Sequence, residues 1–80
     1  METHPYFEEQ VKYDRPYLKR EWLKLALANP MCREVQEDGN IRHWIYLADQ
    51  DKYLRVVTLK DGETVLTAFF DRGFKRRMSK

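Results

Sequence analysis

The sequence predicts an α+β domain in which an N-terminal helix, or a pair of helices, packs on one face of a four-stranded antiparallel meander. Two observations predict this fold. Residues 16–29 place their apolar side chains with a helical period. Two Asp-Gly pairs then each stand between segments whose apolar residues alternate. Because eighty residues are enough for one domain but short for two, we expect a single domain over residues 1–80.

The helical part of the chain follows residues 1–14, which have no clear period and which we expect to be irregular or a short helix. Pro16 suits a first helical turn, where a missing N–H costs nothing. The stretch PYLKREWLKLALA continues with strong helix formers, and one side of it carries Leu18, Trp22, Leu25 and Ala26. Asn29 should end this helix, because the residue before a proline is pushed out of the α region.

The strands are predicted after Pro30, where the apolar period becomes two. Asp38-Gly39 separates MCREVQE from NIRHWIYL, and Asp61-Gly62 separates KYLRVVTLK from ETVLTAFF. A two-residue turn needs positive φ angles, which glycine adopts at little cost. Each pair therefore predicts a hairpin, and two hairpins in succession predict the meander.

Composition bounds the class of protein. Hydrophobic residues make up 42% and charged residues 35%, a globular balance. No apolar run approaches the roughly 18 residues that span a bilayer, and the first residues lack the basic-then-apolar order of a signal peptide. Cys32 is the single cysteine, so no intramolecular disulfide or zinc cluster is expected. We therefore expect a cytoplasmic protein without metal, cofactor or membrane association. Residues 75–80 are expected to form a frayed basic tail.

A core this small is marginal, so a partner subunit is expected to support it, and a homodimer is one form of that support. The candidate site comes from strand register, which two-residue turns fix. Glu34 then faces His43 across the first hairpin. If Leu47 faces Tyr53 in the middle of the sheet, Arg55 joins them. On this register Glu34, His43, Tyr53 and Arg55 share the face that points away from the helix.

These four residue types suit metal-free cleavage of RNA. His43 is the expected base, because its ordinary pKa is about 6.5, and Glu34 would orient its ring. Arg55 would clamp the phosphate, and Tyr53 would donate a proton or stack on a base. Contacts to RNA phosphates are expected from Lys19, Arg20, Arg72 and Lys75. Each feature also has a purely structural interpretation. Glu34 and His43 could be an ordinary cross-strand pair, Tyr53 an aromatic residue at a strand edge, and Lys19 and Arg20 part of the solvent-exposed face of the helix.

The segment GNIRHWIYLADQDKYLRVVTLKDGETVLTAFFDRGFK follows a helix that ends in LANP. Over roughly residues 16–75, this order of elements resembles the RelE/ParE-like toxin superfamily, including its BrnT-like branch. The resemblance implies the toxin of a toxin–antitoxin pair, an endoribonuclease that acts on free or ribosome-bound RNA and is covered by an antitoxin protein. It also implies that Arg55, in the strand YLRVV, is functional.

Two alternatives stay open. ParE-like relatives inhibit a DNA topoisomerase without catalytic residues, so the resemblance also allows a non-catalytic protein-interaction module or a small adaptor. Binding of nucleic acid without cleavage, through the basic tail with Trp44 and Tyr46, is the third interpretation.

Overall fold

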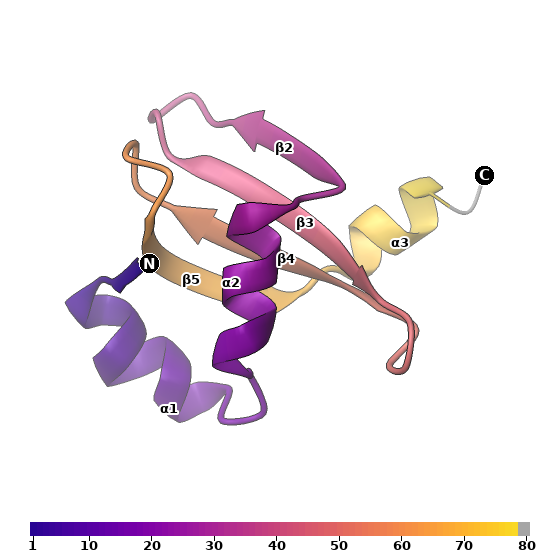
Figure 1. The fold of residues 1–80 in the computed structure, drawn as a ribbon, viewed down its shortest axis with the longest axis horizontal. Coiled ribbons are helices and arrows are strands. Elements are labelled where there is room, and N and C mark those ends of the chain that lie inside the picture. Colours follow the sequence, from indigo (N-terminus) through magenta and orange to yellow (C-terminus); the bar gives the residue numbers. More distant parts are fainter. Residues whose placement is uncertain (79–80) are drawn as a thin grey trace.

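The computed structural model describes residues 1–78 and is α+β, with three helices and a five-stranded mixed sheet in that range (Figure 1). A π-helical turn, η1, runs directly into α1, and both are drawn as one helix. The elements are β1 (Glu2–Thr3), η1 (Phe7–Val11), α1 (Lys12–Asp14), α2 (Arg20–Ala28), β2 (Cys32–Val35), β3 (Ile41–Leu47), β4 (Lys52–Thr58), β5 (Thr64–Phe70) and α3 (Arg72–Met78).

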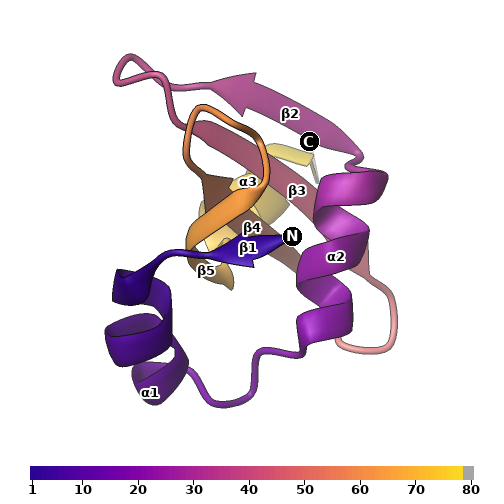
Figure 2. The same ribbon diagram turned by 60° about the vertical axis from the view of Figure 1, so that its left-hand side comes forward.

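The expected four-stranded antiparallel meander is wrong, because the N-terminus adds a fifth strand in parallel. The strand order is β1-β5-β4-β3-β2, and β1 pairs parallel with β5 at the sheet edge (Figure 2). The nitrogen of Glu2 donates to the oxygen of Glu63 at 3.2 Å, and that of His4 donates to Val65 at 2.8 Å. A strand of two residues is too short to show an alternating pattern, so β1 could not be predicted from sequence.

The main helix, α2, is shorter than the predicted segment 16–29. It begins at Arg20 because Lys19 has extended backbone angles, φ −93° and ψ 135°. It ends at Ala28, with Asn29 as the capping residue, close to the end that Pro30 predicted. The length of the helix was therefore overestimated at its start only.

The frayed tail expected over residues 75–80 is a helix as far as Met78, and residues 79–80 lie outside the described part of the chain. Asp71 caps this helix, since its Oδ1 accepts the backbone N–H of Phe74 at 3.0 Å. Phe74 is buried and its ring stacks on that of Trp44, with centroids 4.7 Å apart. The buried ring of Phe74 and the cap from Asp71 thus hold α3 against the sheet, although its composition indicates only a basic segment.

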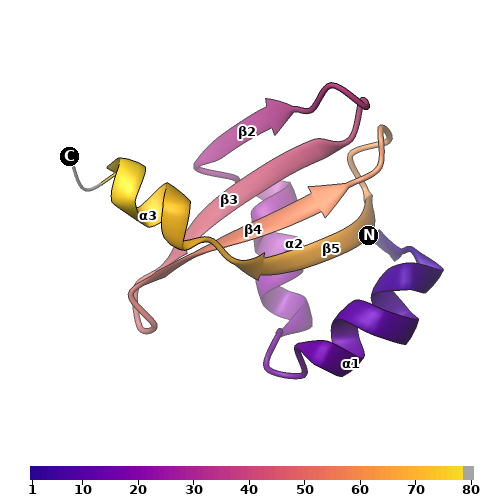
Figure 3. The same ribbon diagram turned by 180° about the vertical axis from the view of Figure 1, so that it is seen from behind.

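The core lies between the sheet and the N-terminal helices, which cover the same face (Figure 1). Phe7 and Val11 from η1 and Leu23 and Ala26 from α2 pack on the strands. The strand residues of this core are Ile45, Leu47, Leu54, Val56, Val65 and Ala68. Helix α3 lies at one end of the opposite face, and most of that face has no helix over it (Figure 3).

The first hairpin is closed by a longer turn than expected. The nitrogen of Gln36 donates to the oxygen of Asn40 at 2.7 Å, which leaves three loop residues instead of two. Gly39 has φ +91°, as a three-residue hairpin loop requires. Glu34 consequently faces Arg42. The pairing of Glu34 with His43 is wrong by one residue.

The middle register also differs from prediction by one residue, and the register of the second hairpin matches at Thr58 and Val65 but differs beyond a bulge. Between β3 and β4 the pairs are Leu47 with Lys52 and Tyr46 with Tyr53. Between β4 and β5 a bulge next to Thr58 shifts the rest of the ladder, so that Arg55 faces Phe69. A slip of one residue turns each side chain to the other face of the sheet. The predicted division of the strands into two faces is therefore wrong for β3 and for the part of β5 beyond the bulge, where Ala68 lies in the core and Phe69 lies beside Arg55.

Candidate functional site

The four predicted catalytic residues do not share a face. His43 points toward α2 and is only 2% exposed, and a hydrogen bond of 3.0 Å joins its Nε2 to Oγ1 of Thr58. Burial, helped by the charge of Arg33, lowers the pKa of His43 and favours the neutral ring. Glu34 and Arg55 lie on the opposite face of the sheet. The expected grouping of His43 with them is wrong, since the buried ring cannot reach a phosphate held there.

Tyr53 lies on the same face as Arg55, where it packs against other aromatic rings. Its ring centroid is 4.9 Å from that of Tyr46 and 5.2 Å from that of Phe74. Tyr46 donates its hydroxyl to Oδ1 of Asp51 at 2.7 Å, and this bond raises the pKa of Tyr46. Tyr53 therefore contacts α3 through Phe74, and Tyr46 packs against Tyr53.

The four predicted phosphate contacts fall into two places. Lys19, Arg72 and Lys75 line adjoining depressions at one end of the sheet. Arg20 lies elsewhere, beside Phe7 on η1. Lys75 already donates to the backbone oxygen and to Oδ2 of Asp51, both at 2.9 Å.

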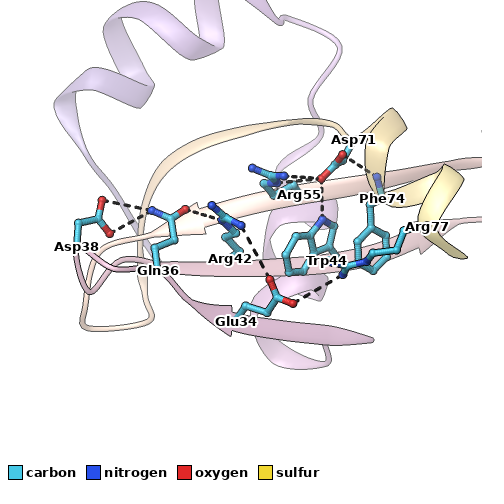
Figure 4. Close-up of polar contacts among 9 residues, drawn as sticks. All are labelled: Glu34, Gln36, Asp38, Arg42, Trp44, Arg55, Asp71, Phe74 and Arg77. Carbon is cyan, nitrogen blue, oxygen red and sulfur yellow. Dashed lines mark hydrogen bonds and ion pairs between the residues drawn. The ribbon is translucent and has the colours of Figure 1, made fainter.

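Three arginines gather on the face that the N-terminal helices leave uncovered, and we call Arg42, Arg55 and Arg77, with Glu34 and Asp71, the arginine face (Figure 4). They come from β3, β4 and α3, and the two acids come from β2 and the start of α3. Only Arg55 and Glu34 of this set were predicted as site residues. Arg77 was not predicted as a site residue, because it lies in the segment that was expected to be a frayed basic tail. The signal that could have found it is Asp71 three residues before Phe74, the spacing of a helix N-cap.

Asp71 connects the strands of the arginine face to helix α3. Its Oδ2 accepts the indole N–H of Trp44 at 3.0 Å, and it accepts Arg55 through Nε at 3.0 Å and Nη2 at 2.8 Å. Burial opposes the charged form of this carboxyl, but the bonds from Trp44, Phe74 and Arg55 outweigh burial and hold the pKa of Asp71 below its ordinary value. Asp71 is thus a fixed anion in ordinary buffers.

Arg55 is held rigidly in the centre of the arginine face. Its guanidinium lies over the rings of Trp44, at 5.4 Å, and Phe69, at 4.9 Å. Nε and Nη2 are bound to Asp71, whereas Nη1 makes no hydrogen bond to any residue in the range 1–78. A guanidinium fixed in this way keeps a fork of N–H groups for an incoming oxyanion.

Glu34 lies between two other guanidiniums without a tight bond to either. Its Oε1 is 3.9 Å from Nη1 of Arg42, and its Oε2 is 3.7 Å from Nη2 of Arg77. The side chain is 44% exposed. Arg42 is held by its Nε, which donates to Oε1 of Gln36 at 2.9 Å. Both oxygens of this carboxylate therefore remain accessible to a ligand.

A small cavity of about 150 Å³ lies among these groups and is bordered by Arg42, Arg55 and Arg77 together with the ring of Trp44. Three cationic side chains stand here against the carboxylates of Glu34 and Asp71, so the cluster is cationic. Guanidinium groups bind phosphate through paired N–H donors. The arrangement is therefore suited to a phosphodiester with a carboxylate beside it.

Within residues 1–78, no group of three or more His, Cys, Asp or Glu side chains is placed to hold a metal ion. In the same range, no helix combines the length and the apolar character needed to cross a membrane. Comparison of the chain with protein-family models, with curated proteins and with solved structures gives no match. The resemblance to the RelE/ParE-like toxin superfamily stays a prediction that rests on the sequence.

Proposed function

We propose that this protein is a metal-independent endoribonuclease that acts as the toxin of a toxin–antitoxin pair, with the arginine face as its reaction site. One observation carries the proposal: the Glu34 carboxylate lies between the guanidiniums of Arg42 and Arg77, on the face that also holds Arg55. Glu34 takes over the role of base that the sequence suggested for His43.

The reaction uses the 2′-hydroxyl of the RNA as nucleophile. That hydroxyl gives its proton to Glu34 while its oxygen forms a bond to phosphorus, and the bond from phosphorus to the 5′-oxygen breaks. The leaving 5′-oxygen takes a proton from water, and the proton on Glu34 neutralises the hydroxide that remains. The products are a 2′,3′-cyclic phosphate and a 5′-hydroxyl. Arg42 and Arg77 stabilise the charge that grows on the phosphate oxygens.

The loose geometry of Glu34 supports its role as base. A carboxylate held at hydrogen-bond distance by two guanidiniums would be a poor base, because they would favour its charged form. At 3.7 Å and 3.9 Å the pairs are long, and a phosphate between the arginines would compete for the same N–H groups. Substrate binding would thus release the carboxylate toward the 2′-hydroxyl.

The test is cleavage of a uridylyl-adenosine dinucleotide by the purified chain in the presence of a chelator. Glu34→Gln keeps the shape of the side chain and should lower kcat about 10²- to 10⁴-fold without changing the melting temperature. Glu37→Gln, in the exposed β2–β3 loop, removes the same charge and is the matched control. Equal cleavage by Glu34→Gln and the wild type, or no cleavage by the wild type, would overturn the proposal.

A non-catalytic protein-interaction module is the second candidate, and the edge of the sheet favours it. β2 is an edge strand, and Val35 in it is 66% exposed. Unpaired strand edges accept a strand from a partner chain, such as an antitoxin or a second copy. Growth arrest separates the two candidates. A cleavage-deficient Glu34→Gln protein that still arrests growth on induction would favour the module.

A further inference from the structure

A second surface lies on the other side of α3 from the arginine face. Two adjoining depressions of about 710 and 550 Å³ share Gln50, Lys52 and Phe70, and together they form one groove. The groove runs from the chain just before α2, past the loop between β3 and β4, to the outer side of α3. The functional site described above does not use it.

Most of the cations in the groove have no carboxylate partner within residues 1–78. Lys75 is paired with Asp51, and the other cations of the groove are Lys19, Lys52, Arg72 and Arg76. None of them forms an ion pair with a carboxylate among the described residues, and the two lysines lie instead over aromatic rings. The acids that border the groove are already paired: Asp51 with Lys75 at 2.9 Å, and Asp71 with Arg55 at 2.8 Å. The surface is therefore strongly positive.

Aromatic rings line the same groove. Tyr17 stacks on Phe70 with centroids 5.1 Å apart and an interplanar angle of 16°, and Trp22 lies tilted against Phe70 at 6.1 Å. Tyr17 is 46% exposed, although it is part of this stack. Its accessible ring offers a platform on which a planar group can stack.

We infer that this groove binds single-stranded RNA and leads it to the arginine face. Phosphates would follow the cations, and an unpaired base would stack on Tyr17, as in other proteins that bind single strands. A duplex keeps its bases stacked inside and would leave the aromatic rings unused. An acidic peptide would use the charges but has no aromatic base for the platform. The substrate class named here rests on the proposed function.

The groove and the arginine face meet at the start of α3. Asp71 borders both the groove and the small cavity among the arginines. Gly73, which also borders that cavity, has no side chain to block a strand between them. A single strand crossing there would pass from the aromatic platform to Glu34.

The test measures binding of a labelled 2′-O-methyl oligouridine, which cannot be cleaved, by fluorescence anisotropy over a range of salt concentrations. Tyr17→Ala should weaken binding about tenfold and leave the salt dependence unchanged, because it removes stacking alone. The double variant Arg72→Gln/Arg76→Gln should lower the slope of log Kd against log salt by about 1.4, from two phosphate contacts at about 0.7 each. A duplex of the same length should bind more weakly.

The matched control removes the same charge elsewhere. Lys24, on α2, and Lys60, in the β4–β5 loop, are exposed and do not border the groove, so Lys24→Gln/Lys60→Gln should bind the strand nearly as the wild type does. Equal weakening by both double variants would overturn the inference, since only net charge would then matter. Displacement of the strand by poly-glutamate as readily as by unlabelled RNA would also overturn it, in favour of a protein ligand.

The two proposals fail separately. Binding of the uncleavable strand does not depend on chemistry at Glu34, so an absence of cleavage leaves the binding result intact. Conversely, cleavage of a dinucleotide does not need a groove that holds a longer strand, so failure of the groove leaves the test of Glu34 intact.

Discussion

The indole N–H of Trp44 donates to Oδ2 of Asp71 at 3.0 Å, and this bond ties the middle of β3 to the start of α3. The same oxygen accepts Nη2 of Arg55 at 2.8 Å, so β4 is joined as well. The other oxygen of Asp71 caps α3. One carboxylate therefore holds the last helix against the sheet and fixes the central arginine of the candidate site.

Replacement of Asp71 should destabilise the fold. Asp71→Asn removes the charge that pairs with Arg55, which is 24% exposed and so keeps some contact with water. We expect a loss of about 2–3 kcal/mol in the free energy of unfolding, below the full cost of breaking a buried pair. Urea denaturation followed by tryptophan fluorescence measures it. Asp49→Asn, in the exposed β3–β4 loop, should shift the midpoint by no more than about 0.5 kcal/mol.

The lowered pKa of Asp71 gives this prediction a pH signature. A carboxyl whose folded pKa is below its unfolded value stabilises the fold above the unfolded pKa of 3.8 and loses that contribution as the pH falls below it. The difference in stability between the wild type and Asp71→Asn should therefore shrink in acid. A difference that stays constant below pH 3.8 would mean that Asp71 acts by shape and not by charge.

His43 should make the fold sensitive to mild acid. Burial lowers its pKa, so between the unfolded pKa of 6.5 and the lower folded value the unfolded chain binds a proton that the folded chain does not. Its contribution to stability is complete above pH 6.5 and falls below it, with a slope that approaches about 1.4 kcal/mol per pH unit. Melting temperatures measured from about pH 7 to pH 5 should show this fall.

The variant His43→Gln isolates the effect, because glutamine cannot titrate and can still form a hydrogen bond with Thr58. Its stability should depend less on pH over the same range than that of the wild type, whatever its absolute value. If both proteins lose stability in parallel, another group titrates there. Reduced cleavage of RNA by this variant with unchanged stability would contradict the assignment of His43 to the core.

The sequence predicted the strands well because each occupies an alternating run bounded by turn residues. The four predicted runs contain β2, β3, β4 and β5, whereas β1 lies outside them. The registers could not be predicted from the turn residues alone. Gly39 serves a three-residue loop as readily as a two-residue turn, and nothing in TVLTAFF shows the bulge in the β4–β5 ladder.

The register errors of one residue determined which side chains were predicted to share the candidate site. Glu34 and Arg55 do lie on the uncovered face, but Trp44 lies with them and His43 lies in the core. The neutral imidazole is buried with Nε2 bonded to Thr58, although Nδ1 has no hydrogen-bond partner among residues 1–78. The polarity of a histidine therefore did not exclude the core. Arg77 could not be placed at all until the helix that carries it was known.

Two glycines should respond in opposite directions to alanine, and the pair tests the backbone of the turn against that of α3. Gly62 has φ +71°, and a Cβ there would meet Nη2 of Arg33 at 3.6 Å and Cδ1 of Ile41 at 3.8 Å, which is ordinary contact. Gly62→Ala should therefore cost about 1–2 kcal/mol through the left-handed backbone alone. Gly73 lies in α3 without a positive φ, and its Cβ would be 3.4 Å from Oδ1 of Asp71. Gly73→Ala should stabilise the protein by up to about 1 kcal/mol, because alanine is the better helix former. Urea denaturation of both variants measures the two changes in the free energy of unfolding. If Gly62→Ala leaves that free energy unchanged, this turn adopts another conformation in solution.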